Sequence, residues 1–235
     1  MPANVTDLDA ALAKSDYDTL NRARAAITDG NALLLFMNWE QVRSFNGEGG
    51  VYLSTRYMSD LWDVGSAMAA QGRQGQAGSD LRVTAVFMGL YSYELLVLDG
   101  TKCADSSAPG HRMDQLATSP VWSFANSIDN AEREKMLDYV VKLEALTASK
   151  RRNDQALCQG GMLDIMQSLQ ALAEQGKAPQ EVPTPPGQIG RTYELPPPEG
   201  GAQFLDPKIW QPEQEKLRAG VRERLEDLLK PPASH

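Results

Sequence analysis

Cysteine, histidine and positive charge are all scarce in this chain. It has two cysteines, and His111 is its only histidine before the last residue. Lysines and arginines number 23 against 31 aspartates and glutamates, which gives a formal net charge of −8 and a pI near 4.9. Because nucleic-acid affinity rests largely on cations that neutralise phosphates, this balance disfavours nucleic acids and anionic membranes as partners.

The sequence also lacks a run of about 20 apolar residues, the length needed to cross a bilayer. The closest candidate, residues 83–98, is interrupted by Thr84, Gly89, Ser92 and Glu94. The first nine residues do not show the basic start and apolar stretch of an export signal. We therefore expect a soluble protein without membrane insertion, and a signal removed earlier would leave no trace.

The two cysteines, Cys103 and Cys158, are too few for a disulfide framework. If they are bridged, they close a loop of about 56 residues and stabilise the fold by roughly 4 kcal/mol. A bridge would indicate an oxidising compartment, periplasmic or extracellular. Two free thiols would instead fit a cytoplasmic protein. The sequence leaves both alternatives open.

Most of the chain shows apolar residues at helical spacing, and the alternation typical of strands is missing. We predict an all-α fold, a helical bundle of about six or seven helices. Residues 83–98 are apolar nearly all the way round and are expected to form the central helix. Helices are expected at residues 6–30, 31–45, 79–98, 111–116, 131–149 and 162–174, and from residue 51 to the Gly- and Gln-rich linker at 71–78.

Single faces are predicted to be buried within these helices. In the second helix, Leu35, Trp39 and Val42 share a face, and helix 162–174 carries an apolar stripe. The cations at positions 150–152 follow a helix end, where the helix dipole favours positive charge. The stripe of helix 162–174 consists of Met162, Ile165, Met166, Leu169 and Leu172.

The composition changes sharply after residue 176. Residues 177–207 contain eight prolines, which favours an extended strap rather than a packed element. We therefore divide the chain into a bundle at 1–176, a strap at 177–207 and a C-terminal helix at 208–235. Asp206-Pro207 resembles an N-cap followed by a favoured first-turn proline, although Pro212 indicates that the regular part begins nearer Gln211. Such a helix needs a surface for its apolar seam, which its own bundle, a sister subunit or another protein could supply. The seam is formed by Leu217, Val221, Leu225 and Leu228.

The polar loop 99–114 carries the densest chemistry of the chain. Cys103, His111 and Asp114 are the residue types of a thiol nucleophile, a base and an orienting carboxylate. No glycine-flanked nucleophile elbow or oxyanion loop accompanies them. The alternative is structural, with His111 capping a helix or bridging Asp114 and with Arg112 paired to Asp105 across the loop.

No cofactor or metal is expected from the sequence. A metal site would have to combine His111 with carboxylates from facing helices, and paired Glu-x-x-His, Cys-x-x-Cys and phosphate-loop motifs do not occur. The carboxylates considered are Glu40, Asp60, Asp63, Glu94 and Asp99.

Aromatic and charged residues mingle between positions 39 and 63. Trp39, Arg43, Arg56 and Trp62 are residue types that dominate binding hot spots. The alternative is a helix pair whose aromatic rings fill the core with their polar tips outward.

The leading hypothesis is a non-enzymatic, acidic helical protein that binds another protein, as an adaptor, inhibitor or immunity protein does. Its partner, or a second copy in a homo-oligomer, is expected to contact the C-terminal arm. The alternative is a hydrolase or transferase with its site at Cys103, His111 and Asp114.

Overall fold

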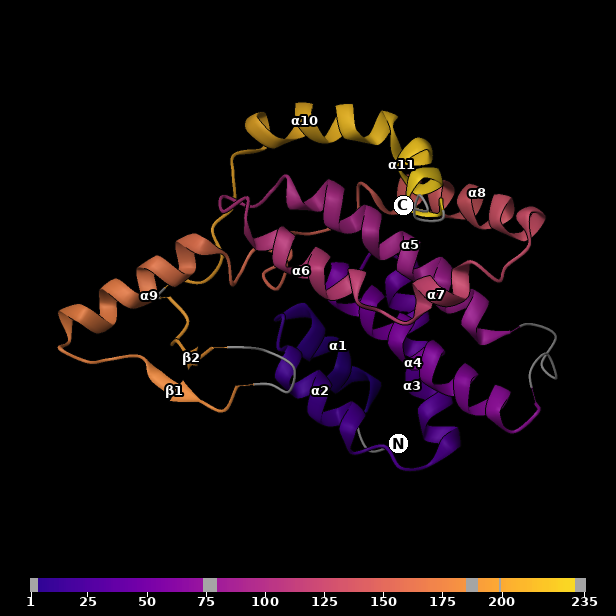
Figure 1. Ribbon diagram of the computed structural model, residues 1–235, viewed down its shortest axis with the longest axis horizontal. Coiled ribbons are helices and arrows are strands. Elements are labelled where there is room, and N and C mark those ends of the chain that lie inside the picture. The colour runs from indigo at the N-terminus through magenta and orange to yellow at the C-terminus, as the bar shows by residue number, and fades with distance from the viewer. Residues whose placement is uncertain (1–3, 74–79, 185–189, 199, 231–235) are drawn as a thin grey trace.

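The structure is a computed structural model, and it describes residues 4–73, 80–184, 190–198 and 200–230. The described chain is an all-α bundle with one small two-stranded sheet set apart from it (Figure 1). The all-α prediction is confirmed. Part of the predicted 71–78 linker and the start of the next predicted helix, residues 74–79, lie outside the described residues.

The N-terminal part of the bundle consists of α1 (Val5–Ala13), α2 (Tyr17–Ala25), α3 (Gly30–Phe45) and α4 (Gly50–Ala70). The prediction of one helix over 6–30 is wrong, because the chain turns at Ser15, whose φ is 55°. Asp16 then caps α2 by accepting a hydrogen bond from the amide of Thr19 at 3.0 Å.

The predicted buried face of α3 is also only partly right. Trp39 is buried, whereas Leu35 and Val42 are 51% and 47% exposed. Phe36 and Met37 are buried beside Trp39 instead. Residues 33–37 are apolar on every side of the helix, so spacing alone does not select the face that meets the rest of the bundle.

The central helix is α5 (Leu81–Gly100), as predicted, and it packs against α4 along much of its length. Tyr91, Leu95 and Leu98 are fully buried in the main core. By length and composition α5 would pass for a membrane span, yet 61% of its apolar window is buried inside the bundle. The helices α6 (Ala108–Ala117), α7 (Val121–Ala125) and α8 (Asn130–Thr147) surround it.

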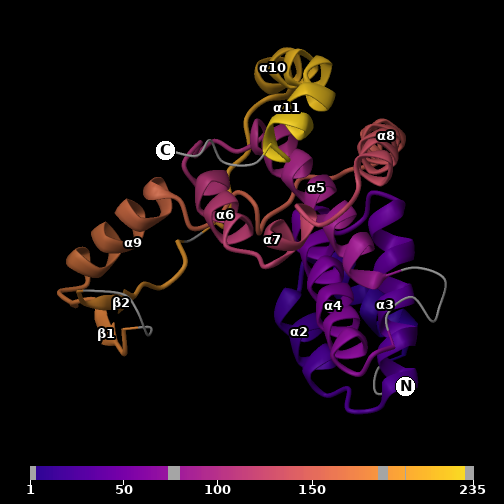
Figure 2. The ribbon, with the colours of Figure 1, turned by 45° about the vertical axis from the view of Figure 1, so that its right-hand side comes forward.

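Beyond α8 the chain leaves the bundle and forms α9 (Met162–Glu174) and a hairpin of β1 (Gln180–Val182) and β2 (Thr192–Glu194). Figures 1 and 2 show this unit projecting to one side of the bundle. The hairpin corrects the prediction of a strap without regular structure over 177–207. Its strands pair antiparallel, with Glu181 opposite Tyr193. Residues 185–189 and 199 of the predicted strap lie outside the described residues.

The chain then returns to the bundle as α10 (Pro207–Ala219) and α11 (Val221–Leu228). α10 begins four residues before Gln211, with Pro212 inside it, because Asp206 caps it by accepting from the amide of Lys208 at 2.8 Å. The predicted seam is covered by the protein's own bundle. Val221 and Leu225 are buried in the main core, and Leu217 and Leu228 pack against it.

Candidate functional site

The segment after α5 is tied to two distant parts of the chain. Cys103 and Cys158 form a disulfide, so the bridged alternative is confirmed. The backbone on either side of Cys103 also pairs with the stretch before α10. Ala104 donates to the carbonyl of Gln203 at 3.0 Å, and Leu205 donates to the carbonyl of Lys102 at 2.8 Å. This segment is therefore a structural junction.

The structure does not bring the proposed catalytic residues together. The sulfur of Cys103 is bonded to Cys158, and the residue is 2% exposed. His111 is exposed, and its Nε2 lies 3.2 Å from Nε2 of Gln115. Asp114 is exposed on the same helix, α6. The hypothesis of a thiol nucleophile activated by His111 is wrong for this disulfide-bonded form, because it contains no free cysteine.

The structural alternative is right about the loop and wrong about its pairing. Arg112 does not bond to Asp105. Its Nε donates to the carbonyl of Ala156 and its Nη1 to Oε1 of Gln115, both at 3.1 Å. His111 contacts Gln115, and none of its described contacts is with Asp114.

Asp105 holds the start of α9. Its carboxylate accepts from the amide of Ser107 at 2.9 Å and from the amide of Leu163 at 2.7 Å. Burial disfavours the charge of Asp105, but these hydrogen bonds hold its pKa below the usual value. A Cβ at Gly161 would lie 2.1 Å from Oδ2 of Asp105, so only glycine fits there. The projecting helix is thus fixed at its N-terminal end.

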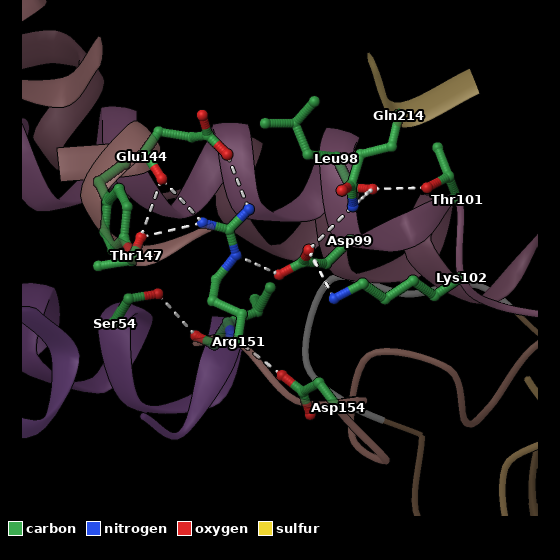
Figure 3. Close-up of polar contacts among 12 residues, drawn as sticks. Ser54, Leu98, Asp99, Thr101, Lys102, Glu144, Thr147, Arg151, Asp154 and Gln214 are labelled. Carbon is green, nitrogen blue, oxygen red and sulfur yellow. Dashed lines mark hydrogen bonds and ion pairs between the residues drawn. The ribbon is translucent and has the colours of Figure 1, made fainter. Parts of the chain in front are cut away.

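A buried charge cluster of Asp99, Lys102, Glu144 and Arg151 lies between α5, α8 and α10 (Figure 3). Arg151 donates to Asp99 Oδ2 and to Glu144 Oε1, both at 2.8 Å. Lys102 Nζ lies 3.0 Å from the other oxygen of Asp99. As expected of a cation at a helix end, Arg151 also donates to the last-turn carbonyl of Glu144 at 3.2 Å, but it is buried and its main partners are the two carboxylates.

The surroundings of Arg151 keep it charged. Burial alone would lower its pKa, but Asp99 and Glu144 reverse this effect and raise the pKa above its usual value. Two further arginines bring the C-terminal helices to the same region. Arg218 of α10 contacts Glu144 at 3.2 Å, and Arg224 of α11 contacts the buried Glu94 at 2.6 Å. The network joins the last helices to the core.

The aromatic and charged residues of α3 and α4 contact other residues of the same chain. Trp39 donates its indole NH to Asp9 at 2.8 Å, and Arg43 contacts the same carboxylate at 2.6 Å. Trp62 packs edge-on against Phe124, with 5.8 Å between ring centroids. The prediction that Trp39 and Trp62 belong to a recognition surface is therefore replaced by the core alternative.

A second buried acid, Glu40, lies beneath these residues and is 0% exposed. Arg56 Nε is 3.0 Å from Glu40 Oε1. Burial nevertheless raises the pKa of Glu40 to about 9, and the nearby charge of Asp60 acts in the same direction. Burial thus outweighs the charge of Arg56 in setting the pKa of Glu40.

Among the described residues, no group of three or more histidine, cysteine, aspartate or glutamate side chains could hold a metal ion. Asp60 pairs with Arg24 at 2.7 Å, and Asp99 and Glu94 belong to the ion pairs above.

One helix of the described chain, α9, exposes most of its large apolar side chains. Ser168 is its only buried residue, and the apolar residues of the helix face solvent. We call this surface the α9 face; it consists of Met162 (58% exposed), Leu163 (46%), Ile165 (37%), Met166 (62%) and Leu169 (42%).

The α9 arm, residues 161–184 and 190–198, is held in place from within the chain. Ser107 Oγ accepts from the amide of Met162 at 2.8 Å, next to the contact of Asp105 with Leu163. On the opposite side, the hydroxyl of Ser168 donates to the carbonyl of Pro196 at 2.7 Å. The segment that follows β2 is thereby linked to the polar side of α9, and the apolar side is left uncovered. Four residues of the predicted stripe, at positions 162, 165, 166 and 169, belong to this face; Leu172 is half-buried, Leu163 was not predicted, and helical spacing does not show that the stripe is exposed.

The comparisons with known proteins add no functional information. The chain matches no protein-family model, no curated protein and no solved structure.

Proposed function

We propose that this protein works by binding another protein through the α9 face, in an adaptor, inhibitor or immunity role, and not by catalysing a reaction. The observation that carries the proposal is the contrast between five exposed apolar residues and a single buried serine on one helix. The C-terminal seam no longer needs a partner, because the bundle covers it.

An exposed apolar face of this kind is typical of a helix that enters a groove on a partner. Isolated amphipathic helices are marginal in water, and their stability comes from burying the apolar side. Apolar anchors at positions 162, 165, 166 and 169 follow the i, i+3, i+4, i+7 spacing used in helix-in-groove recognition. Two of these are methionines, whose flexible side chains adapt to irregular surfaces.

The charges around the α9 face favour a partner with a basic rim. Residues 161–198 contain four acidic side chains and two basic ones, and Arg191 already lies 3.7 Å from Glu181. The acidic residues are Asp164, Glu174, Glu181 and Glu194. Complementary charge at an interface rim affects association rate and specificity more than affinity. We expect binding to weaken moderately with salt.

The disulfide adds a proposal about compartment. Disulfides persist in oxidising environments, so we infer that the protein functions outside the reducing cytoplasm, in a periplasmic or extracellular space. Its partner would then be exposed to the same space.

The test compares two apolar surfaces of the same protein. The double variant Met166→Glu, Leu169→Glu charges the α9 face, and Leu146→Glu charges a position on α8 that is 68% exposed, close to the 62% of Met166. Both variants are compared with the unmodified protein in affinity capture from the native host, and their folding is checked by thermal unfolding.

We expect the α9 variant to lose its bound partner and the α8 variant to keep it. Loss of the partner in both variants, or in Leu146→Glu alone, would show that the interface does not lie on α9. Sedimentation velocity over a range of concentrations identifies a second copy as the partner, because self-association would then increase with concentration and disappear only in the α9 variant.

A further inference from the structure

A cavity of about 610 Å³ lies between α2, α4, α6 and the chain just before Cys158. This volume is within the range of about 300–1,000 Å³ that is typical of small-molecule sites. The cavity is separate from the α9 face, since none of its lining residues belongs to α9.

The inner side of the cavity is apolar. Val51 and Met58 of α4, Leu116 of α6 and Leu157 line it, and all four belong to the main core. One wall is formed by Tyr17 and Tyr52, whose rings are stacked with 4.0 Å between centroids. Such a surface accepts an aliphatic chain or an aromatic ring.

The charge of the cavity is opposite to that of the protein. Among the described lining residues Arg112 is the only one with a charged side chain, although the chain as a whole carries a net charge of −8. Arg112 is half-buried, and its two anchoring hydrogen bonds go to neutral oxygens, the carbonyl of Ala156 and Oε1 of Gln115. No carboxylate pairs with it in the described part of the chain. Its positive charge is thus positioned but not neutralised.

The tyrosine wall is held in place by polar groups behind it. Asn21 Oδ1 accepts from the hydroxyl of Tyr52 at 2.8 Å and from Nη1 of Arg56. Behind the wall, Nε of Arg56 lies 3.0 Å from Oε1 of the buried Glu40, so Arg112 remains the charge that the cavity itself presents. Asp154, which contacts the hydroxyl of Tyr17, also accepts from the backbone amide of Val51 at 2.9 Å.

We propose that this cavity binds a small amphipathic carboxylate, with its head at Arg112 and its apolar body over Met58, Leu116 and Leu157. A fixed guanidinium with free donor positions suits a carboxylate, and charge-assisted hydrogen bonds are about twice as strong as neutral ones. The apolar floor discriminates against small hydrophilic anions, which would leave it exposed to water.

The probe is octanoate, with octanol and octyltrimethylammonium as neutral and cationic analogues of the same chain length. Titrations of the full-length, disulfide-bonded protein are followed by calorimetry and by backbone amide chemical shifts. We expect octanoate to bind about tenfold or more tightly than octanol, since hydrogen bonds to charged groups contribute about 1.5–3 kcal/mol. The amide shifts should cluster around Tyr52, Leu116 and Leu157.

Arg112→Gln should reduce octanoate affinity about tenfold or more and leave octanol affinity unchanged, with Arg112→Lys in between. Arg152→Gln, which removes an exposed arginine outside the cavity, is the matched control and should have little effect. Equal binding of octanoate and octanol, equal losses in the two arginine-to-glutamine variants, shifts centred on α9, or no octanoate binding would each overturn the proposal. The comparison of octanoate with octanol needs no variant, so it stands even if Arg112→Gln does not fold.

Discussion

The bundle and the α9 arm differ in the kinds of side chain that they bury. In the bundle, charged residues such as Asp99, Glu144 and Arg151 are buried and paired with one another. On α9, apolar residues are exposed and a serine is buried. The buried charges of the bundle thus find their partners within the chain, whereas the apolar residues of α9 present a surface that another molecule can complete. The predictions below test this contrast.

The buried charge cluster should give the largest effect. Arg151→Met leaves Asp99 and Glu144 without their shared partner, and breaking a buried ion pair costs about 3–5 kcal/mol. We expect a decrease of this size in the free energy of unfolding, measured by urea denaturation. The control is Arg222→Met, which removes an arginine that pairs with Glu134, Asp138 and Glu226 and has a side chain that is 37% exposed. Exposed pairs contribute about 0–1 kcal/mol, so equal losses in the two variants would contradict the cluster's role.

Removing the disulfide should give the next largest loss in the free energy of unfolding. Replacing Cys103 and Cys158 together by serine removes a cross-link between residues 55 positions apart. Closing a loop of this length stabilises the folded protein by about 4 kcal/mol through the entropy of the unfolded chain. We expect a lower urea midpoint with little change in the helical circular dichroism of the native state. A variant with unchanged stability would show that the network around Asp99 already restrains the same segments.

The C-terminal seam and the α9 face provide the most direct comparison between the bundle and the arm. Leu225 of α11 is 0% exposed, whereas Leu169 of α9 is 42% exposed. Leu225→Ala should cost about 2–5 kcal/mol through the cavity it leaves, and Leu169→Ala should stay within about 0.5 kcal/mol of the unmodified protein. Similar losses would mean that α9 is covered in solution, for example by a second copy, and dilution would then lower the stability of the unmodified protein.

The buried Glu40 of the bundle should make the free energy of unfolding depend on pH. Its pKa is raised by burial from 4.5 to about 9, so between these values the folded protein holds a proton that the unfolded chain releases. The stability contributed by protonated Glu40 is full below pH 4.5 and is lost as the pH rises toward 9. Glu40→Gln should therefore be more stable than the unmodified protein by about 1–3 kcal/mol at pH 8 and nearly equal to it at pH 4.

Unfolding free energies measured across this pH range check the prediction, with the exposed Glu215→Gln on α10 as a control that should leave the curve unchanged. A Glu40→Gln variant that is less stable at pH 8 would show that Glu40 is ionised and held by Arg56.

The local features of the fold could be predicted from the sequence, and the features that depend on distant residues could not. Helical spacing predicted α9 from Met162 to Glu174 and identified the central helix. It could not distinguish the seam at Leu225 from the stripe at Leu169, because periodicity shows that a face is apolar and not whether something covers it. The burial of Arg151 depends on Asp99, which is 52 positions away in the sequence.

The same reasoning explains the errors of detail. The left-handed residue Ser15 split a predicted helix, although nothing in its residue type demands that conformation. The hairpin over residues 180–194 was missed because backbone pairing between two short strands carries little sequence signal. Cys103 and His111 are close in sequence, but the disulfide removes the thiol that the catalytic hypothesis required.

The central claim, that the α9 face binds a partner, is tested most directly by site-specific photo-crosslinking in the native host. A photoreactive phenylalanine analogue replaces Met166 on α9 in one protein and Leu146 on α8 in another, since their side chains are similarly exposed, at 62% and 68%. The account predicts a single heavier crosslinked species from position 166 that is absent from position 146. No crosslink from position 166, or the same species from both positions, would contradict it.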